Sequence, residues 1–332
     1  MDEKTPKPKN DQALRNVEVA PLPATTHQRY IEAATSDNTR RTYQSAIRHF
    51  EAWGGLLPAD EAMVIRYLLD HADRLNPRTL SLRLTALRQW HRLQSFPDPT
   101  DGAEVRKTLK GIERIHGQPK RKAKAFRLED LERMIARLDE SECLKHVRDR
   151  ALLLLGFFGA FRRSELVAID IEHLAWEPEG LIITLPRSKT DQTGEGKIKA
   201  LPYGEGPLCA ASALRQWLEL SETDQGPVFR GITRWSALKS ERLNPASVNQ
   251  ILKTAAEDAG LDFVPDLSSH SLRRSLATNA HRSGASFKSI KRQGGWSHDA
   301  TVWEYIDEAQ RFEDNAVAVL LSKATQRDDT KL

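Results

Sequence analysis

The chain has 332 residues, with 50 Lys and Arg against 46 Asp and Glu, and a formal net charge of +4. This length is enough for about two domains of ordinary size. Net charge is too small to identify a partner, but its distribution is uneven, with nine Lys and Arg against three Asp and Glu at residues 100–127. Clustered positive charge is typical of a phosphate-binding surface, and a solvated linker is an equal alternative.

Several classes of protein are excluded by local patterns. The longest apolar run, residues 151–161, is shorter than the roughly 20 residues that span a bilayer. Residues 1–24 are rich in Lys and Pro and lack the apolar core of a secretory signal, so we expect a cytoplasmic protein with no membrane partner. Cys143 and Cys209 have neither metal-ligand nor disulfide spacing, and we expect both to be free, buried thiols.

The first part of the chain predicts a helical bundle. Residues 1–24 contain four prolines and little apolar periodicity, which predicts a disordered tail. A helix is expected after Ser36 or Asp37 and before Gly54, because these residues suit a cap and a stop. Further helices are predicted at residues 60–71, from 76–77 onward and at 103–116. A helical domain over residues 25–116 follows.

A second domain is predicted after a basic linker, residues 117–126. It covers residues 127–325 and is followed by a short tail, residues 326–332. Two β-branched or alternating segments, residues 181–185 and 197–201, are expected to pair as a β-hairpin. Helices are predicted at residues 127–138, 147–158, 207–220 and 245–260. The fold class is therefore mainly α, with an N-terminal helical bundle and a mixed α/β C-terminal domain that contains a small β-hairpin or sheet.

Charged and titratable side chains are spread through this second domain. Arg162 and Glu165 follow the apolar helix at 147–158, where an arginine needs an anion to offset desolvation, although a surface ion pair is about as good an explanation. Lys189 lies near the hairpin tip, where most lysines only solvate the turn. His270 and Arg273 are three residues apart, so on a helix they share one face.

These side chains, together with Tyr305, fit the chemistry of a phosphodiester. Guanidinium groups form bidentate hydrogen bonds with phosphate oxygens and can take the place of a metal. A tyrosine can supply the attacking oxygen, and a lysine can protonate the leaving oxygen. The sequence contains no P-loop, GxGxxG, HExxH or GxSxG motif and no paired carboxylates for two metals. We therefore predict no metal and no cofactor, and ATP is not required because covalent attachment conserves the bond energy.

Five segments in this order resemble a tyrosine recombinase of the phage integrase family, and within it the Cre-like recombinases. They are GAFRRSEL at residues 159–166, RSKT at 187–190, HSLR at 270–273, GGWSH at 294–298 and VWEYI at 302–306. Each segment alone is a weak signal, but the set in order is specific. Resemblance extends over roughly residues 25–325, with the less diagnostic helical part matching the family's core-binding domain. Many members carry histidine where this chain has Trp296.

The resemblance implies roles for the central residues. Arg162 and Arg273 would hold the scissile phosphate, and Tyr305 would attack it to give a 3′-phosphotyrosine and a free 5′ hydroxyl. Lys189 would protonate the leaving 5′ oxygen. The 5′ hydroxyl of a partner strand then reverses the step, and paired exchanges pass through a Holliday junction.

Supporting roles follow from the same resemblance. His270 would accept or orient the tyrosine proton, and Glu165 would orient its neighbours. Trp296 would support the phosphate pocket, because an indole donates one hydrogen bond but cannot shuttle a proton. Candidate DNA-binding residues are the basic side chains of the first domain and the linker, with one further arginine: Arg40, Arg41, Arg83, Arg88, Lys120, Arg121, Lys122, Lys124 and Arg274.

The expected partner is double-stranded DNA carrying a specific recombination site, together with further copies of the chain. The amphipathic segment at residues 312–321 would dock into a neighbouring subunit of a cyclic tetramer, although packing on its own domain is an alternative. Accessory proteins are possible partners. Two other functions remain open at this point: a type IB topoisomerase, which acts as a monomer, and a non-catalytic DNA-binding accessory protein.

Overall fold

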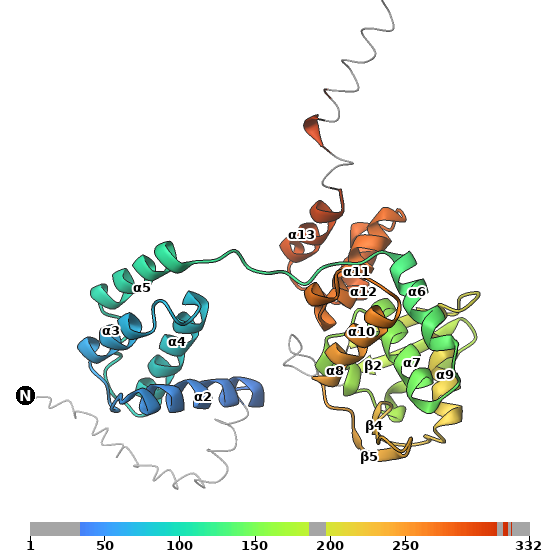
Figure 1. The fold of residues 1–332 in the computed structure, drawn as a ribbon, viewed down its shortest axis with the longest axis horizontal. Helices are drawn as coiled ribbons and strands as arrows, with labels where there is room; N and C mark the ends of the chain where they lie inside the picture. Colours follow the sequence, from blue (N-terminus) through green and yellow to red (C-terminus); the bar gives the residue numbers. More distant parts are fainter. Residues whose placement is uncertain (1–33, 186–196, 311–314, 318–319, 321–332) are drawn as a thin grey trace, which may run out of the picture. The chain divides into compact units, whose positions relative to one another are not determined.

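The computed structural model describes residues 34–185, 197–310, 315–317 and 320. Contacts divide the chain into two compact units, Met1–Lys120 and Arg121–Leu332, whose boundary lies inside the basic segment at residues 117–126 (Figure 1). The described residues are mostly helical, with small antiparallel sheets confined to the second unit. This confirms the fold class predicted from the sequence.

The first unit is a bundle of helices whose starts are fixed by side-chain caps. Ser36, Asp60 and Asn76 each accept a hydrogen bond from a backbone N–H of the following first turn. The helices of the bundle are α2 (Asp37–Trp53), α3 (Glu61–Asp70), α4 (Pro77–Leu93) and α5 (Ala103–His116). Helix α2 packs on α4, and α5 covers α3 and α4. Their apolar stripes meet in one core built around Phe50, Leu68 and Leu80.

The second unit is organised around helix α7 (Leu144–Phe158), which packs on five other helices. Its residues 151–155 are all fully buried, so the helix is apolar on every side, as predicted from its sequence. The other helices of this unit are α6 (Leu128–Asp139), α8 (Arg163–Val167), α9 (Ala210–Leu220), α10 (Ser247–Asp258), α11 (Ser269–Arg282), α12 (Phe287–Gly294) and α13 (Asp299–Gln310). Two short 3₁₀ turns lie at Ile171–His173 and Val264–Asp266.

Two antiparallel sheets complete the second unit. The larger has the order β1 (Leu174–Glu177), β2 (Gly180–Leu185) and β3 (Lys197–Pro202). The pairing of β2 with β3 is the predicted hairpin, in the register that sets Ile183 opposite Lys199. Strand β1 and the small sheet of β4 (Arg230–Ile232) and β5 (Leu238–Arg242) were not predicted, because their residues are mostly polar or half-exposed and show little apolar alternation.

One prediction about the cysteines was wrong. Cys209 is buried, but Cys143 is exposed. Cys143 occupies the N-cap of α7, in the connection from α6, and such connections run over the protein surface.

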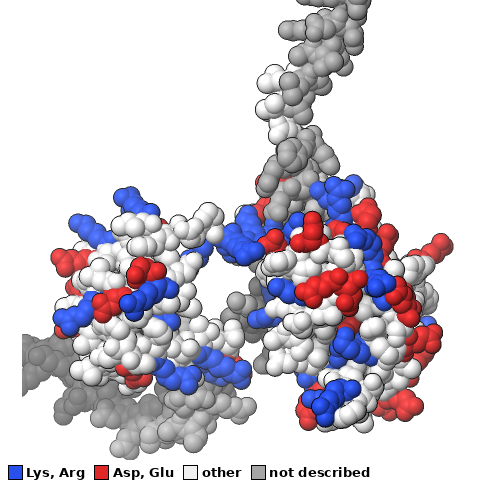
Figure 2. Space-filling view, viewed as in Figure 1, with Lys and Arg blue, Asp and Glu red and all other residues white. Residues whose placement is uncertain are grey.

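Charge is mixed on the face of each unit drawn in Figure 2, where Lys and Arg side chains are interspersed with Asp and Glu. Neither drawn face is therefore dominated by charge of one sign. Within the described residues, no helix is both long and apolar enough to cross a membrane.

Candidate active site

The first part of the site is the turn that leaves helix α7. Ala160 has a φ of +48°, an uncommon backbone conformation for a residue with a Cβ. A Cβ on the preceding Gly159 would lie 2.1 Å from the Phe161 ring, so only glycine allows this ring to fold back. The turn delivers Arg162 to the N-cap of α8, with its side chain about one-quarter exposed.

Arg162 is held by Glu165, one turn along the same short helix. The Glu165 carboxylate accepts the Arg162 backbone N–H at 2.8 Å and its guanidinium at 2.5 Å. Burial alone would raise the pKa of Glu165, but the bonds and charge of Arg162, with the charge of Arg273, outweigh burial and leave this pKa lowered. Glu165 is therefore an ionised, buried carboxylate that orients a guanidinium.

Arg273 is the most enclosed cation of the predicted set. It lies on α11 with 3% of its surface exposed, and its guanidinium donates to the Ala160 carbonyl and stands 4.9 Å from the Trp296 ring centre. Burial, followed by the nearby charge of Arg162, lowers the pKa of Arg273 to about 10. His270, one turn earlier on α11, is exposed to solvent. The two motif residues thus occupy the same end of α11, at different depths.

Trp296 reaches this cluster through a glycine turn at the end of α12. Gly295 adopts a left-handed φ of +64°, and its N–H closes the helix on the carbonyls of Lys291 and Arg292. A Cβ on Gly294 would lie 1.8 Å from the Trp296 ring. The GGW sequence is therefore required for the indole to fold back over Arg273.

Tyr305, on α13, completes the cluster. Its side chain is 8% exposed, and its ring meets Trp296 edge to face, with centroids 5.7 Å apart. Burial raises the pKa of Tyr305, and the charges of Arg273 and Arg274 only partly offset this effect. The phenol therefore keeps its proton at neutral pH.

Two lysines complete the comparison of predicted and observed positions. Lys189 lies outside the described residues. Lys199, which was not singled out in the sequence, is on β3 with 3% of its surface exposed and lies close to Arg273 and Glu165. The signal that could have found it is the alternation of the predicted strand, since Lys199 is two residues before the inward-facing Leu201.

The predicted DNA-binding residues of the first unit occupy three different settings. Arg41 and Arg83 line a shallow hollow of about 330 Å³ between α2 and α4. Arg40 lines a separate hollow of about 630 Å³ between the same two helices. Arg88 is engaged by Asp98, with 3.0 Å between nitrogen and carboxylate oxygen.

A buried polar group fixes the position of Arg83. Its guanidinium donates to the Tyr67 hydroxyl at 2.7 Å and contacts the Nδ1 atom of His49. Burial, followed by the charge of Arg83, lowers the pKa of His49, so that the imidazole is neutral and accepts this bond. The Arg83 side chain is thus held in place by Tyr67 and His49, at the edge of the hollow that it lines together with Arg41.

Most of the linker's basic residues contact the second unit. Arg121 pairs with Asp266 at 2.6 Å, and Lys122 pairs at 2.6 Å with Glu304, the residue before Tyr305. Lys124 lies over the Phe263 ring, and Lys120 is exposed.

Arg274, predicted to bind DNA, is 4% exposed, and its guanidinium stands 5.1 Å from the centre of the Tyr305 ring. The structure therefore brings it to the tyrosine. In the described part of the chain, no group of three metal-ligating side chains comes together.

The model of the phage integrase family matches residues 124–311. The chain belongs to this family. It is 36% identical to an integrase/recombinase XerD homolog of Selenomonas ruminantium over 305 residues, which cover 89% of each chain. Identity to the Cre recombinase of Escherichia phage P1 is 26% over 296 residues, covering 82% of this chain and 84% of Cre. The chain is thus a tyrosine site-specific recombinase.

The fold of the recombinase agrees with solved structures of the same kind. A lambda integrase tetramer bound to a Holliday junction matches with a TM-score of 0.59 and 17% identity, over 88% of this chain and 79% of that chain. At this level of identity the likeness concerns the fold alone.

Proposed function

We propose that Tyr305 is the nucleophile of this recombinase and that it attacks the scissile phosphate of duplex DNA at a specific site. The observation that carries the proposal is the meeting of Tyr305 with Trp296, Arg273 and Arg274 in one buried cluster. A buried phenol beside two guanidiniums has its oxygen placed where a phosphate anion would be bound. Such an arrangement favours covalent attack, since the anion and nucleophile share one pocket.

In this proposal Arg162 and Arg273 bind the non-bridging oxygens and stabilise the charge that develops during attack. His270, exposed at the end of α11, takes or orients the tyrosine proton, and Lys189 protonates the leaving 5′ oxygen. Glu165 holds Arg162, and Trp296 packs against both Arg273 and Tyr305. The product is a 3′-phosphotyrosine with a free 5′ hydroxyl, which rejoins strands through a Holliday junction without metal or ATP.

Covalent trapping tests the nucleophile. Wild type and Tyr305→Phe are expressed with DNA of the native host, and adducts that survive denaturation are isolated and their attached DNA is sequenced. We expect adducts from the wild type only, with one shared sequence at the attachment point. Adducts from both proteins would mean that another residue attacks. Adducts from neither, despite equal DNA binding, would contradict the cleavage reaction.

Binding to DNA and to further copies of the chain is part of the same proposal. The sites in question are the Arg41–Arg83 hollow for DNA and an apolar groove of about 860 Å³ on the second unit for another subunit. The lambda integrase relative is described as a tetramer on a Holliday junction, which supports a tetramer here. We place this assembly in the cytoplasm, on nucleoid DNA, with accessory proteins as further partners.

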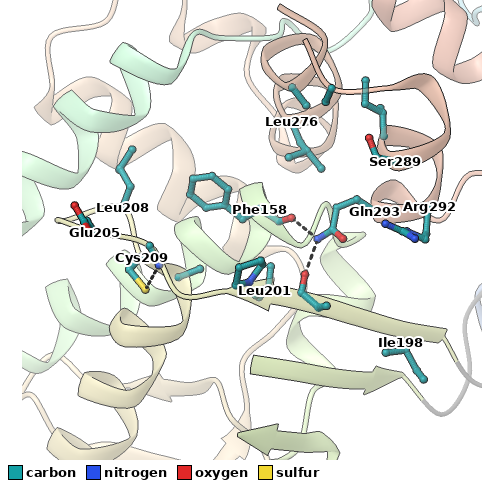
Figure 3. Close-up of a pocket in the computed structure, with 17 residues that line it drawn as sticks. Phe158, Ile198, Leu201, Glu205, Leu208, Cys209, Leu276, Ser289, Arg292 and Gln293 are labelled. Carbon is teal, nitrogen blue, oxygen red and sulfur yellow. Dashed lines mark hydrogen bonds between the residues drawn. The ribbon is translucent and has the colours of Figure 1, made fainter. Parts of the chain in front are cut away.

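The groove lies between β3, α11 and α12 and is shown in Figure 3. Phe158, Leu201 and Leu276 give it an apolar floor, and Ile198 is 69% exposed at its edge. We propose that residues 312–321 of a second copy fill it. Most of this segment lies outside the described residues, but Val317, which is described, is 60% exposed, so it has apolar surface to bury.

An aspartate in the groove separates assembly from DNA binding. Ile198→Asp should leave the binding of one subunit to DNA unchanged and abolish the tetramer on a junction, because a charge would be buried against apolar side chains. Leu220→Asp, which changes an exposed leucine outside the groove, is the matched control. Native gel shifts with a four-way junction give both readouts. Equal tetramer formation by the two variants would argue against this docking site.

A further inference from the structure

Strand β3 separates the active site from the groove. Its residues alternate in burial: Ile198 and Ala200 are exposed and line the groove, whereas Lys199 and Leu201 are buried, and Leu201 also contributes to the floor of the groove. A lysine is almost never fully buried without a partner, because removing an ammonium from water is costly. Lys199 is an exception to this rule, because only 3% of its surface is exposed.

The ammonium of Lys199 is anchored on the turn that carries Trp296. Its Nζ donates to the backbone carbonyl of Gln293 and stands 5.8 Å from the centre of the Phe161 ring. A Cβ built on Gly295 would lie 3.6 Å from the same nitrogen. The lysine is thus enclosed between the turn after α7 and the turn after α12, which are the two turns that place Arg162 and Trp296.

No carboxylate pairs directly with Lys199 among the described residues, and its charged surroundings are mainly positive. Facing it are Arg162 and Glu165 from the start of α8, Arg273 from α11 and Lys197 from its own strand. Glu165 already accepts two bonds from Arg162. Burial, followed by the charge of Arg273, lowers the pKa of Lys199 to about 7. Among the described residues, the cations around Lys199 therefore outnumber its one nearby carboxylate, Glu165.

We propose that Lys199 is a further residue of the cleavage site, which takes up a proton when the scissile phosphate enters and so adds a third positive charge beside the two arginines. The proposal rests on the function proposed for Tyr305. Gln293 holds the amine in place, and the phosphate supplies a further anion. A proton from bulk solvent converts the neutral amine to an ammonium as the phosphate binds, and no bond to carbon or phosphorus changes in this step.

The sign of the pH effect follows from the charges. In the free protein the amine is half-protonated at a pH of about 7 and neutral above it. A bound phosphate favours the ammonium and raises its pKa, so the proton is taken up mainly between pH 7 and the higher pKa of the complex. DNA affinity should therefore fall as the pH rises through this window. Binding of the phosphate should be coupled to the uptake of at most one proton per site. Cleavage should fall in the same window, as the ammonium is lost.

The protonation state of Lys199 can be measured directly, without activity. The protein carries ¹³C-labelled lysine in the Tyr305→Phe background, and the Lys199 signal is assigned as the one lost in Lys199→Arg. We expect its ¹³Cε shift to titrate near pH 7 in the free protein. Addition of sulfate, a phosphate analogue that does not titrate in this range, should move the midpoint upward by more than one pH unit. A midpoint near 10 with or without sulfate would overturn the proposal.

Adduct formation supplies the second readout. Lys199→Gln should slow it at pH 7 by roughly ten- to hundredfold, the range for loss of one charged donor. Lys199→Arg should recover much of this rate and lose the decline above pH 7. The matched control is Lys239→Gln, an exposed lysine on β5 that is not among the charges acting on Lys199, and this variant should keep the wild-type pH profile.

These outcomes separate the two proposals. An absence of wild-type adducts would contradict the role of Tyr305, while the titration of Lys199 would still report on the phosphate pocket. Normal adducts with the same rate and pH profile in wild type and Lys199→Gln would overturn the role of Lys199 alone.

Discussion

Replacement of Glu165 by glutamine tests whether this carboxylate balances the cations of the site. A glutamine side chain is close to glutamate in shape, and its oxygen could still accept the Arg162 backbone N–H, so the variant removes charge more than packing. Glu165 is 7% exposed and interacts with Arg162 and Arg273. Removing one partner of a buried pair costs about 3–5 kcal/mol. Because Arg162 is one-quarter exposed, we expect a somewhat smaller loss, about 2–4 kcal/mol.

The assay is thermal unfolding of the second unit in the full chain. A loss of this size corresponds to a fall in Tm of roughly 5–15 °C. Glu257→Gln, an exposed glutamate of the same unit, is the control and should change Tm little. Sulfate should restore part of the stability of Glu165→Gln and less of the wild type, since an anion would replace the lost carboxylate.

The pH dependence gives an independent check. The pKa of Glu165 is lower in the folded protein than its ordinary value of 4.5. Its ion pair therefore contributes fully to stability above about pH 4.5, and this contribution is lost as the pH falls through the folded pKa. Wild type and Glu165→Gln should converge in Tm at acid pH. Equal Tm values at pH 7, or a gap that persists unchanged at low pH, would refute the charge-balance argument.

Two further predictions concern the glycine turn and the first unit. Gly294→Ala should destabilise the second unit by about 1–3 kcal/mol and lower adduct formation, because its Cβ would overlap Trp296; wild-type adduct yields would rule this out. Arg41→Ala should weaken DNA binding and reduce the salt slope of log K by about one, whereas Arg88→Ala should leave the slope unchanged because Asp98 already holds its charge. Equal slopes for both variants in a gel-shift titration would contradict this assignment.

The helices were largely predictable from the sequence because their signals are local. Helix starts are predicted by the capping residues Ser36, Asp60 and Asn76, and the apolar run of α7 predicts a buried helix. Strands β1, β4 and β5 were missed since most of their side chains face solvent or lie half-buried, which leaves no apolar alternation to recognise. Their pairing is decided by contacts between backbones, and composition does not report such contacts.

Most residues of the candidate site could be predicted from the sequence. How deeply each side chain is buried, and which side chains it contacts, could be predicted much less well. The sequence order identified Arg273 and Tyr305, and the structure brings both into one cluster. It grouped Arg274 with the DNA-binding surface, yet Arg274 is buried against Tyr305. From the sequence we selected Lys189, which lies in the RSKT segment, and did not select Lys199. Depth below the surface depends on what packs from other segments, and a residue's neighbours in sequence do not fix it.

Strand β3 and Gln293 connect the two sites of the second unit. Gln293 holds Lys199 with its backbone carbonyl, while its side-chain amide lines the groove and donates to the carbonyls of Phe158 and Ala200, at 2.8 and 3.3 Å (Figure 3). A segment seated in the groove would therefore press on the same strand and turn that hold the ammonium. Because a packed interior does not deform freely, we expect a displacement of Gln293 to alter the contact that holds Lys199. If the proposed docking and phosphate sites are both correct, Gln293 is the residue through which occupation of the groove would reach the ammonium.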